Sequence, residues 1–352
     1  MVSLSRLSLV LLLATLCAGM AALAAGALAA PAAEARFVRI GTGPVGGTYF
    51  PIGGSIANMI SAPPGAAPCS RGACGVPGLI AAAVSTSGSP DNVRQLAAGS
   101  IELALCQADI AREAFAGEGD FAGHPVRGLR AIANLFPEAL HVVVRDGTIR
   151  TLAELRGKRV SLGETSSGTL TAARMVLRAA GLRPRDIIPR YERLNRSMEM
   201  LIGGEIDAFF IVGGAPVAAV AMAGERMPIA LLPVPAAEAE RIIASHPSFI
   251  ATTIPAGTYA GVGETPTIAV RAQLVTLATL PDSLVYGITR ALWDPRNRRL
   301  LDINPIGPQI RLETATEHLA VPLHPGARRF YAEQAAPSPG EQSDARMPLS
   351  DR

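Results

Sequence analysis

Residues 38–49, VRIGTGPVGGTY, decide the fold. Val38 to Gly41 is an apolar run that predicts a short strand, and a glycine-rich turn follows it. From Tyr49 to Ile60 the apolar residues recur at helical spacing, which predicts a helix. A strand that passes through a glycine turn into a helix is the building unit of a parallel α/β sheet.

The same order of strand, turn and helix recurs along the rest of the chain, with no internal sequence repeat. Further strands are predicted at 79–85, 101–105, 140–144, 159–162, 206–212, 229–232 and 267–275, and helices at 91–98, 109–116, 169–180, 197–202, 215–222, 236–244 and 282–293. We expect an α/β fold of two lobes, one formed by 36–140 plus 256–334 and the other by 141–255. Two crossing segments would then form a hinge, with a ligand cleft between the lobes.

The two ends of the chain differ from its body. Residues 1–35 begin with one charge, Arg6, continue through the apolar run 7–17 and end in small residues. This is the pattern of a secretory signal peptide with cleavage after about residue 29 or 35, and a retained membrane anchor is the alternative. From 335 to 352 the composition predicts a disordered tail. A net charge of +3 with no basic block makes nucleic acid an improbable partner.

A chain that is exported through the membrane reaches an oxidising compartment, where cysteine pairs can form disulfides. Cys69 and Cys74 bracket a four-residue segment in a loop rich in proline and glycine, 62–78, and in an oxidising compartment they predict a disulfide. Two free thiols are the alternative. Cys106 lies in an apolar run and is expected to be a buried, unreactive thiol.

Three turns, 41–49, 85–92 and 163–169, place glycines and hydroxyl residues immediately before helices. Glycine lets the backbone approach a ligand closely, and the free N–H groups at a helix start can hold an anion. Ser89 is placed as the N-cap of its helix. Ligands of open α/β sheets bind beyond the carboxyl ends of the strands, so the three turns together predict a small-anion site that needs no arginine. For each turn alone, simple helix capping is the alternative.

Signatures of cofactors, metals and catalysis are missing from the sequence. The turn at 41–46 matches G-x-G-x-x-G, but the acidic residue expected about 20 positions later is absent, which excludes a nicotinamide dinucleotide site. There is no G-x-S-x-G and no H-E-x-x-H, and the histidines have no metal-site spacing. We therefore expect no catalytic residue, cofactor or metal. An exported hydrolase would need a base near a cleft serine, and no histidine is near one in the sequence.

Several short motifs, in order, resemble the TAXI family of solute-binding subunits of TRAP transporters. They are Gly43-x-x-Gly46-Gly47-Thr48-Tyr49, 86–89 with Asn92, 105–107 with Asp109, 155–160, 204–210, Gly213-x-x-Pro216 and 322–327. The resemblance spans about residues 38–331. It implies a two-lobe periplasmic-binding-protein fold of the type II-like kind, in the periplasm, which binds a glutamate-like or dicarboxylate-like anion and delivers it to a membrane permease. A sensory protein of the same fold that signals through a partner is the alternative.

The resemblance also implies which residues contact the ligand. They are Gly47, Thr48, Tyr49, Ser87, Ser89, Gln107, Thr165, Ser166, Ser167, Gly168 and Thr169. Tyr49 would stack on the ligand or hydrogen-bond to it, and Gln107 would contact a polar group. Glu164 stands where a small residue is common in the family, and we expect its side chain to point to solvent. If it entered the cleft, it would oppose an anion or favour a ligand with an amino group.

Overall fold

The computed structural model describes residues 35–67, 69, 74–147 and 149–335. The predicted signal peptide, apart from Ala35, lies outside the described residues. So does the predicted tail, apart from Ala335, which ends a helix. Within the described part of the chain, no helix has both the length and the apolar character that a bilayer crossing requires.

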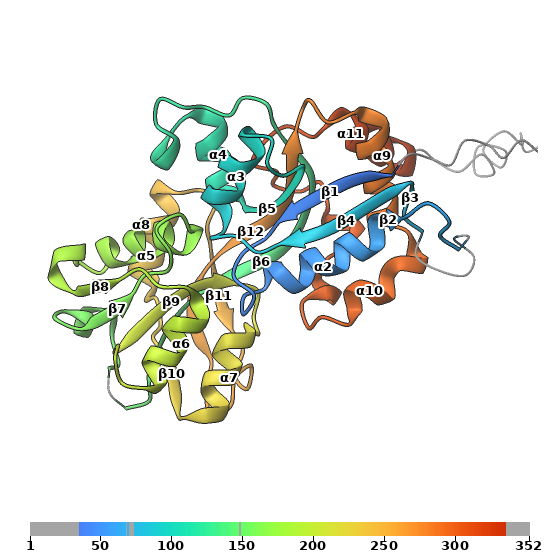
Figure 1. The fold of residues 1–352 in the computed structure, drawn as a ribbon. Coiled ribbons are helices and arrows are strands. Elements are labelled where there is room, and N and C mark those ends of the chain that lie inside the picture. Colours follow the sequence, from blue (N-terminus) through green and yellow to red (C-terminus); the bar gives the residue numbers. More distant parts are fainter. Residues whose placement is uncertain (1–34, 68, 70–73, 148, 336–352) are drawn as a thin grey trace, which may run out of the picture. The chain divides into compact units, whose positions relative to one another are not determined.

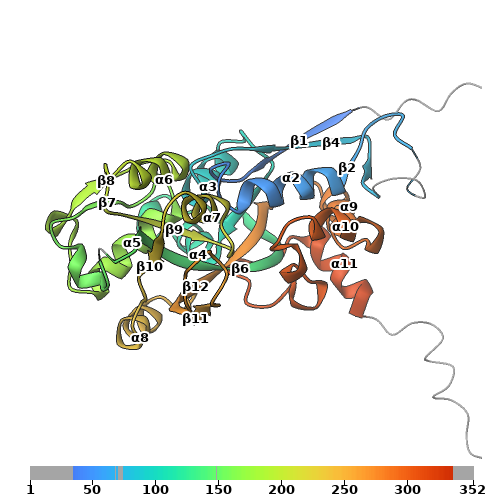
Figure 2. The same cartoon turned by 90° about the horizontal axis from the view of Figure 1, so that it is seen from below.

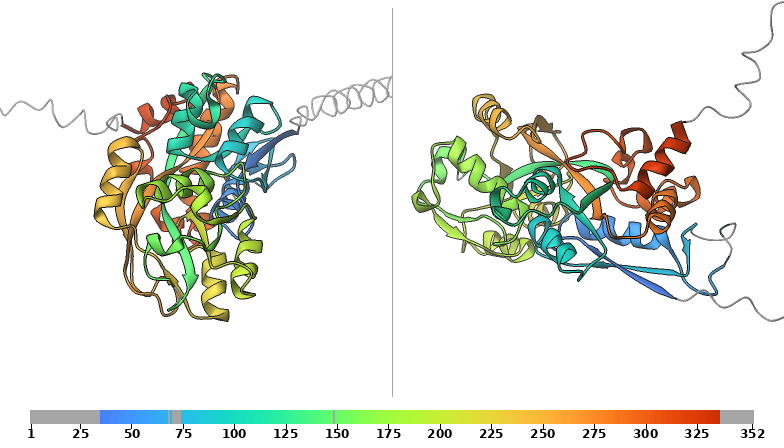
Figure 3. Two further views of the ribbon diagram at one scale, coloured as in Figure 1. Left: turned by 90° about the vertical axis from the view of Figure 1, so that its left-hand side faces the viewer. Right: turned by 90° about the horizontal axis from the view of Figure 1, so that it is seen from above.

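One group of strands forms the first part of a ten-stranded mixed sheet (Figure 1). Its order is β4 (Leu79–Val84), β1 (Arg36–Gly41), β5 (Leu103–Gln107) and β12 (Thr265–Leu277), with the first three parallel. Helices pack on both faces. They are α2 (Tyr49–Ile60), α9 (Asp282–Leu292), α10 (Arg298–Asp302) and α11 (Pro325–Ala335) around one apolar cluster, and α3 (Ser89–Ala97) and α4 (Ala108–Ala116) around another. Orange α9 and red α11 lie side by side in both views of Figure 3.

The second group of strands repeats this arrangement. Its order is β6 (Leu129–Arg145), β9 (Ala208–Gly213), β7 (Arg159–Ser161) and β8 (Ile188–Arg190), and β10 (Ile229–Leu231) also pairs with β6. The covering helices are α5 (Gly168–Ala179) and α8 (Ala236–Ser245) in one cluster, and α6 (Leu194–Ile202) and α7 (Ala218–Arg226) in the other. Each group contains three parallel strands, and the one that comes first in the chain, β1 or β7, lies between the other two, so their carboxyl ends lie together.

Two long strands, β6 and β12, connect the groups. They pair with each other antiparallel from Leu129–Leu277 to Ala139–Ala269. Beyond that ladder, β6 pairs with β9 and β12 pairs with β11 (Ile250–Ile254). Figure 2 shows both strands passing from one group into the other. The α/β fold class is thereby confirmed, with two crossing segments.

Three local expectations were incomplete or wrong. The crossing strand was predicted as 140–144 but begins at Leu129, because Pro137 interrupts its apolar run in sequence yet is accommodated opposite Arg271. The predicted loop 62–78 begins within one short strand, β2 (Ser61–Ala62), and contains its partner, β3 (Val76–Pro77). Ser89 is not an N-cap. Gly88 takes that position at φ 115°, which glycine alone adopts easily.

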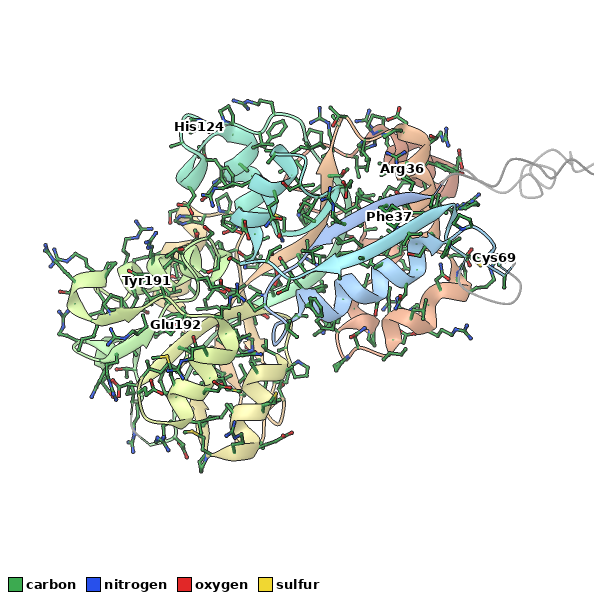
Figure 4. All side chains as sticks on the ribbon, viewed as in Figure 1. Arg36, Phe37, Cys69, His124, Tyr191 and Glu192 are labelled. Atoms are coloured by element: carbon green, nitrogen blue, oxygen red, sulfur yellow. A yellow bond between two sulfur atoms is a disulfide. The ribbon has the colours of Figure 1, made fainter. Side chains whose placement is uncertain are left out.

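The predicted disulfide is confirmed. Cys69 and Cys74 are bonded, with their Cα atoms 4.6 Å apart, and the backbone N–H of Cys74 donates to Asn297 Oδ1 at 2.9 Å. Cys106 is a buried free thiol, as expected. Figure 4 shows Cys69 at the same end of the sheet as Arg36, where β1 begins. The disulfide therefore secures the loop at the amino end of β1, away from the carboxyl ends of the strands.

Candidate functional site

A cavity of about 60 Å³ lies at the carboxyl ends of the strands of both groups. It is lined by the turn after β1, the end of β5, the turn after β7 and the end of β9. Most of the predicted contact residues line it: Gly47, Thr48, Tyr49, Ser89, Gln107, Ser167, Gly168 and Thr169. Ser87, Thr165 and Ser166 do not line it. The structure thus brings segments 120 residues apart around one small space, although the ligand contacts themselves stay a prediction.

Two long helices begin at this cavity. Helix α2 begins at Tyr49, and α5 begins at Gly168 with Ser167 as its N-cap. The first four N–H groups of a helix have no partner within the helix, and the helix dipole makes that end favourable for negative charge. A Cβ at Gly168 would collide with the Gln107 amide, so glycine is needed for this close approach of the α5 backbone to β5. The two ends face the cavity from different groups of the sheet.

The hydroxyl groups of the predicted residues that line the cavity form hydrogen bonds within the protein. Ser167 Oγ donates to Glu164 O at 2.7 Å and accepts from the Leu170 N–H at 3.1 Å. The other contacts are Thr48 Oγ1 donating to Gly214 O at 3.1 Å, Thr169 Oγ1 accepting from the Val212 N–H at 3.2 Å, and Ser89 Oγ accepting from the Gln107 N–H at 3.0 Å. These side chains hold the cavity walls together. The capping alternative therefore describes Ser167 correctly.

The amide of Gln107 is different. Its residue is 3% exposed, and its Oε1 is one of the buried side-chain atoms of the described chain that have no hydrogen-bond partner. An unpaired buried acceptor costs about 1–3 kcal/mol. A ligand that donates a hydrogen bond would remove that penalty.

Glu138 lines the cavity, and the sequence analysis missed it. It is 2% exposed on β6, and Tyr49 Oη donates to its Oε2 at 2.6 Å. Burial raises the pKa of Glu138 well above its usual range, and the negative charge of Asp109 raises it further, against the effect of the Tyr49 hydrogen bond. Burial beside Glu138 also raises the pKa of Tyr49. A carboxyl group in the mostly apolar crossing segment was the signal that could have identified it.

A second buried acid stands behind Glu138. Asp109, in the first turn of α4, is 4% exposed, and burial followed by the charge of Glu113 raises its pKa to about 7. Its Oδ1 has no hydrogen-bond partner within the described residues. The interior next to the cavity is therefore poor in compensating positive charge.

The structure contradicts the expectation that Glu164 points to solvent. Its side chain is 16% exposed and lines the cavity edge. Ser87 Oγ donates to its Oε2 at 3.0 Å, and Arg193 Nε lies 3.4 Å from the same oxygen. The reason is tertiary, because Ser87 comes from the other group of strands and draws the carboxylate inward. Close by, Asp91 N–H donates to Ser166 O at 3.3 Å.

Comparison with solved structures gives distant resemblances. The alkanesulfonate-binding protein SsuA of Xanthomonas axonopodis pv. citri, bound to MOPS, is 19% identical over 89% of this chain and 91% of that one, with a TM-score of 0.44. The periplasmic aliphatic sulphonate binding protein SsuA of Escherichia coli is 15% identical over 87% and 95%, with a TM-score of 0.43. A structure described as a periplasmic transporter is 15% identical over 88% and 94%, with a TM-score of 0.48.

Comparison with protein families gives a match over most of the sequence. The model of the NMT1-like family matches residues 40–335, from within β1 to the end of α11, and so includes both groups of strands and every residue that lines the cavity. Because this match covers far more than half of the chain, the protein belongs to the NMT1-like family.

Proposed function

We propose that this protein is a periplasmic solute-binding protein that captures a small organic anion in the cavity and delivers it to a membrane transporter. One observation carries the proposal: α2 and α5, from different groups of strands, both begin at the same small cavity. Helix starts favour negative charge, and a site shared by two bodies can close around its ligand.

The lobes and hinge follow from this proposal. Lobe one comprises 36–140 plus 256–334 and lobe two 141–255, and the crossing strands β6 and β12 act as the hinge between them. Contacts across the cleft, such as Thr48 to Gly214 O and Ser87 to Glu164, would form on closure and break on opening. The proposed contact residues are the members of the sequence-derived set that line the cavity, with backbone N–H groups as the main anion ligands.

The finer assignment concerns the transporter and the ligand. We propose a TRAP-type permease as the partner and a glutamate-like or dicarboxylate-like anion as the ligand, supported by the ordered sequence motifs. Membership in the NMT1-like family is compatible with this and does not choose between transporter classes. We propose no catalysis, because the cavity serines engage in hydrogen bonds that build its walls, and the described residues lining it include no histidine.

A thermal-shift screen tests the proposal. The protein, purified after export from the full-length chain, is melted with amino acids, dicarboxylates, keto acids, sulfonates and sugars. A ligand that binds only the folded state adds about 2.7 kcal/mol to the free energy of unfolding at 100 times its Kd. We expect one class of organic anion to raise the melting temperature.

Controls separate this function from its alternatives. Gly168→Ala should reduce the shift, because its methyl group meets the Gln107 amide, whereas Gly54→Ala, where a methyl group meets no neighbouring atom within 4 Å, should keep it. The binding function would be contradicted if no class of ligand changed the melting temperature and native mass spectrometry detected no retained small molecule. A bound ligand with no uptake defect on deletion of the gene would favour the sensory alternative.

A further inference from the structure

The cavity has an unusual balance of charge for an anion site. The ionisable carboxyl side chains that line it are Glu138, Glu164 and Glu192, and the lining residues within the described chain include no Lys, Arg or His. Figure 4 labels Glu192 beside Tyr191, in the segment between β8 and α6. An anion held only by helix N-termini would therefore lie among carboxyl groups.

The three carboxyl groups are not equivalent. Glu164 is engaged by Ser87 and Arg193 at the cavity edge, and Glu192 is partly exposed. Glu138 is buried, and its described hydrogen bonding consists of the Tyr49 phenol on Oε2. Its Oε1 has no partner within the described residues and belongs to a residue that lines the cavity. Glu138 and Glu192 therefore both have hydrogen-bonding positions left for a ligand, and Glu138 is the buried one of the two.

A second acceptor, independent of Glu138, lines the same cavity. Gln107 is 3% exposed, and its Oε1 has no hydrogen-bond partner within the described chain. Gln107 ends β5 and Glu138 lies on the crossing strand β6, and together they form one wall, whereas α5 begins on the neighbouring wall, beside the Gln107 amide. A ligand that matched both walls would present N–H donors to one and an anionic group to the other.

We propose that Glu138 is a specificity-determining residue, and that the ligand carries an ammonium or comparable cationic N–H group together with its anionic group. This inference rests on the proposed function and deepens it. The cationic group lies against Glu138 Oε1 and the Gln107 amide oxygen, and the anionic group lies at the starts of α2 and α5. Tyr49 positions the Glu138 carboxyl group by occupying Oε2. Plain dicarboxylates are the class that this arrangement rejects.

Buried charge explains why the preference is strong. A carboxylate without a cation is costly in an apolar interior, whereas one hydrogen-bonded to a cation gains a charge-assisted bond. A ligand that lacks the amine leaves both Glu138 and Gln107 unpaired. Sites built to hydrogen-bond a particular group discriminate against analogues without it more strongly than apolar pockets discriminate by size.

Matched pairs of ligands test the inference by isothermal titration calorimetry. The pairs are L-glutamate with glutarate, L-aspartate with succinate, L-alanine with propionate, and taurine with ethanesulfonate, each differing by one amino group. We expect the amino member of the binding pair to bind at least about tenfold more tightly than its partner. In Glu138→Gln this ratio should fall to within about threefold. The variant retains an amide oxygen that accepts the Tyr49 hydrogen bond, so it should fold.

A matched control removes a carboxylate elsewhere. Glu240→Gln, on the exposed side of α8, should keep the full preference for the amino member. Equal binding of both members, or a preference that persists in Glu138→Gln, would overturn the inference and leave the binding function intact. Tight binding of a dicarboxylate alone would do the same, and it would indicate that Glu138 donates a proton to the ligand. If no member of any pair binds, both this inference and the proposed anion-binding function fail. Should Glu138→Gln not fold, a ratio near one in the unaltered protein would still overturn the inference.

Discussion

Two carboxyl groups of one cavity have opposite environments. On the cavity floor, Glu138 is 2% exposed, and its described polar contact is the Tyr49 phenol. At the rim, Glu164 has a 16% exposed side chain, accepts a hydrogen bond from Ser87 and lies 3.4 Å from Arg193, whose side chain is 77% exposed. The same residue type is thus kept without a cation in one place and paired with one in the other.

The difference separates recognition from closure. A buried polar group without a hydrogen-bond or charge partner reduces stability, and such groups cluster at functional sites. The buried part of the cavity around Glu138 is therefore suited to selecting a ligand. Exposed ion pairs contribute about 0–1 kcal/mol, so the rim can form and break without a large barrier. Substitutions around Glu138 should therefore change which ligand binds, and substitutions around Glu164 should change how the cavity opens and closes.

The largest effect is expected from Asp109, the buried acid near Glu138. The folded-state pKa of Asp109 is raised to about 7, from a usual value near 4, so the stability linked to its protonation is fully present below about pH 4, where the unfolded chain is protonated too. Its contribution is lost as pH rises to about 7, which amounts to as much as about 4 kcal/mol. Asp109→Asn should remove this loss and unfold at higher urea concentration than the unaltered protein at pH 8. Urea unfolding at pH 5 and pH 8 measures most of this loss, about 3 kcal/mol.

The control for that prediction is Glu240→Gln, which should keep the pH dependence of the unaltered protein. If Asp109→Asn destabilises the fold equally at both pH values, a favourable interaction of the Asp109 carboxylate offsets the cost of its burial, and the prediction is wrong.

A smaller effect is expected from the wall between the lobes. In Gly168→Ala the new methyl group would collide with the Gln107 amide and prevent the close contact between the start of α5 and β5. Ligand affinity should fall by about 2 kcal/mol, in the range of a lost charge-assisted hydrogen bond, or roughly thirtyfold by calorimetry. Gly54→Ala is the matched control, because a methyl group there meets no neighbouring atom within 4 Å. Equal affinity in the two variants would mean that the start of α5 does not contact the ligand.

The smallest effect is expected at the rim. Arg193→Ala removes an exposed partner of Glu164 and should weaken binding by at most about 1 kcal/mol, mainly through faster ligand release. The difference should shrink at high salt, because exposed charges are screened. Stopped-flow release at low and high salt checks this. Arg241→Ala, from an ion pair within α8, should leave release unchanged. A loss as large as that expected for Gly168→Ala would mean that Arg193 binds the ligand itself.

Much of this arrangement could be predicted from local patterns. Helix α2 occupies Tyr49–Ile60 as expected, because its apolar spacing and the glycine turn before it are local signals. Gln107 and Gly168 were also expected at the site. Glu138 was missed because Pro137 and the carboxyl group made residues 129–139 unlike a buried strand. The orientation of Glu164 was wrong because its partner, Ser87, lies 77 residues away in the sequence.

By itself, the sequence determined the α/β class, the disulfide pairing and the turns from which the cavity is built. Periodicity, glycine and cysteine spacing act over a few residues, and those features depend on nothing more distant. Only the tertiary structure decided which hydroxyl groups the walls use, that Glu138 lies on the floor, and that its carboxyl group has no cation beside it among the described residues. Burial and charge compensation depend on segments brought together by folding, so no local pattern contains them.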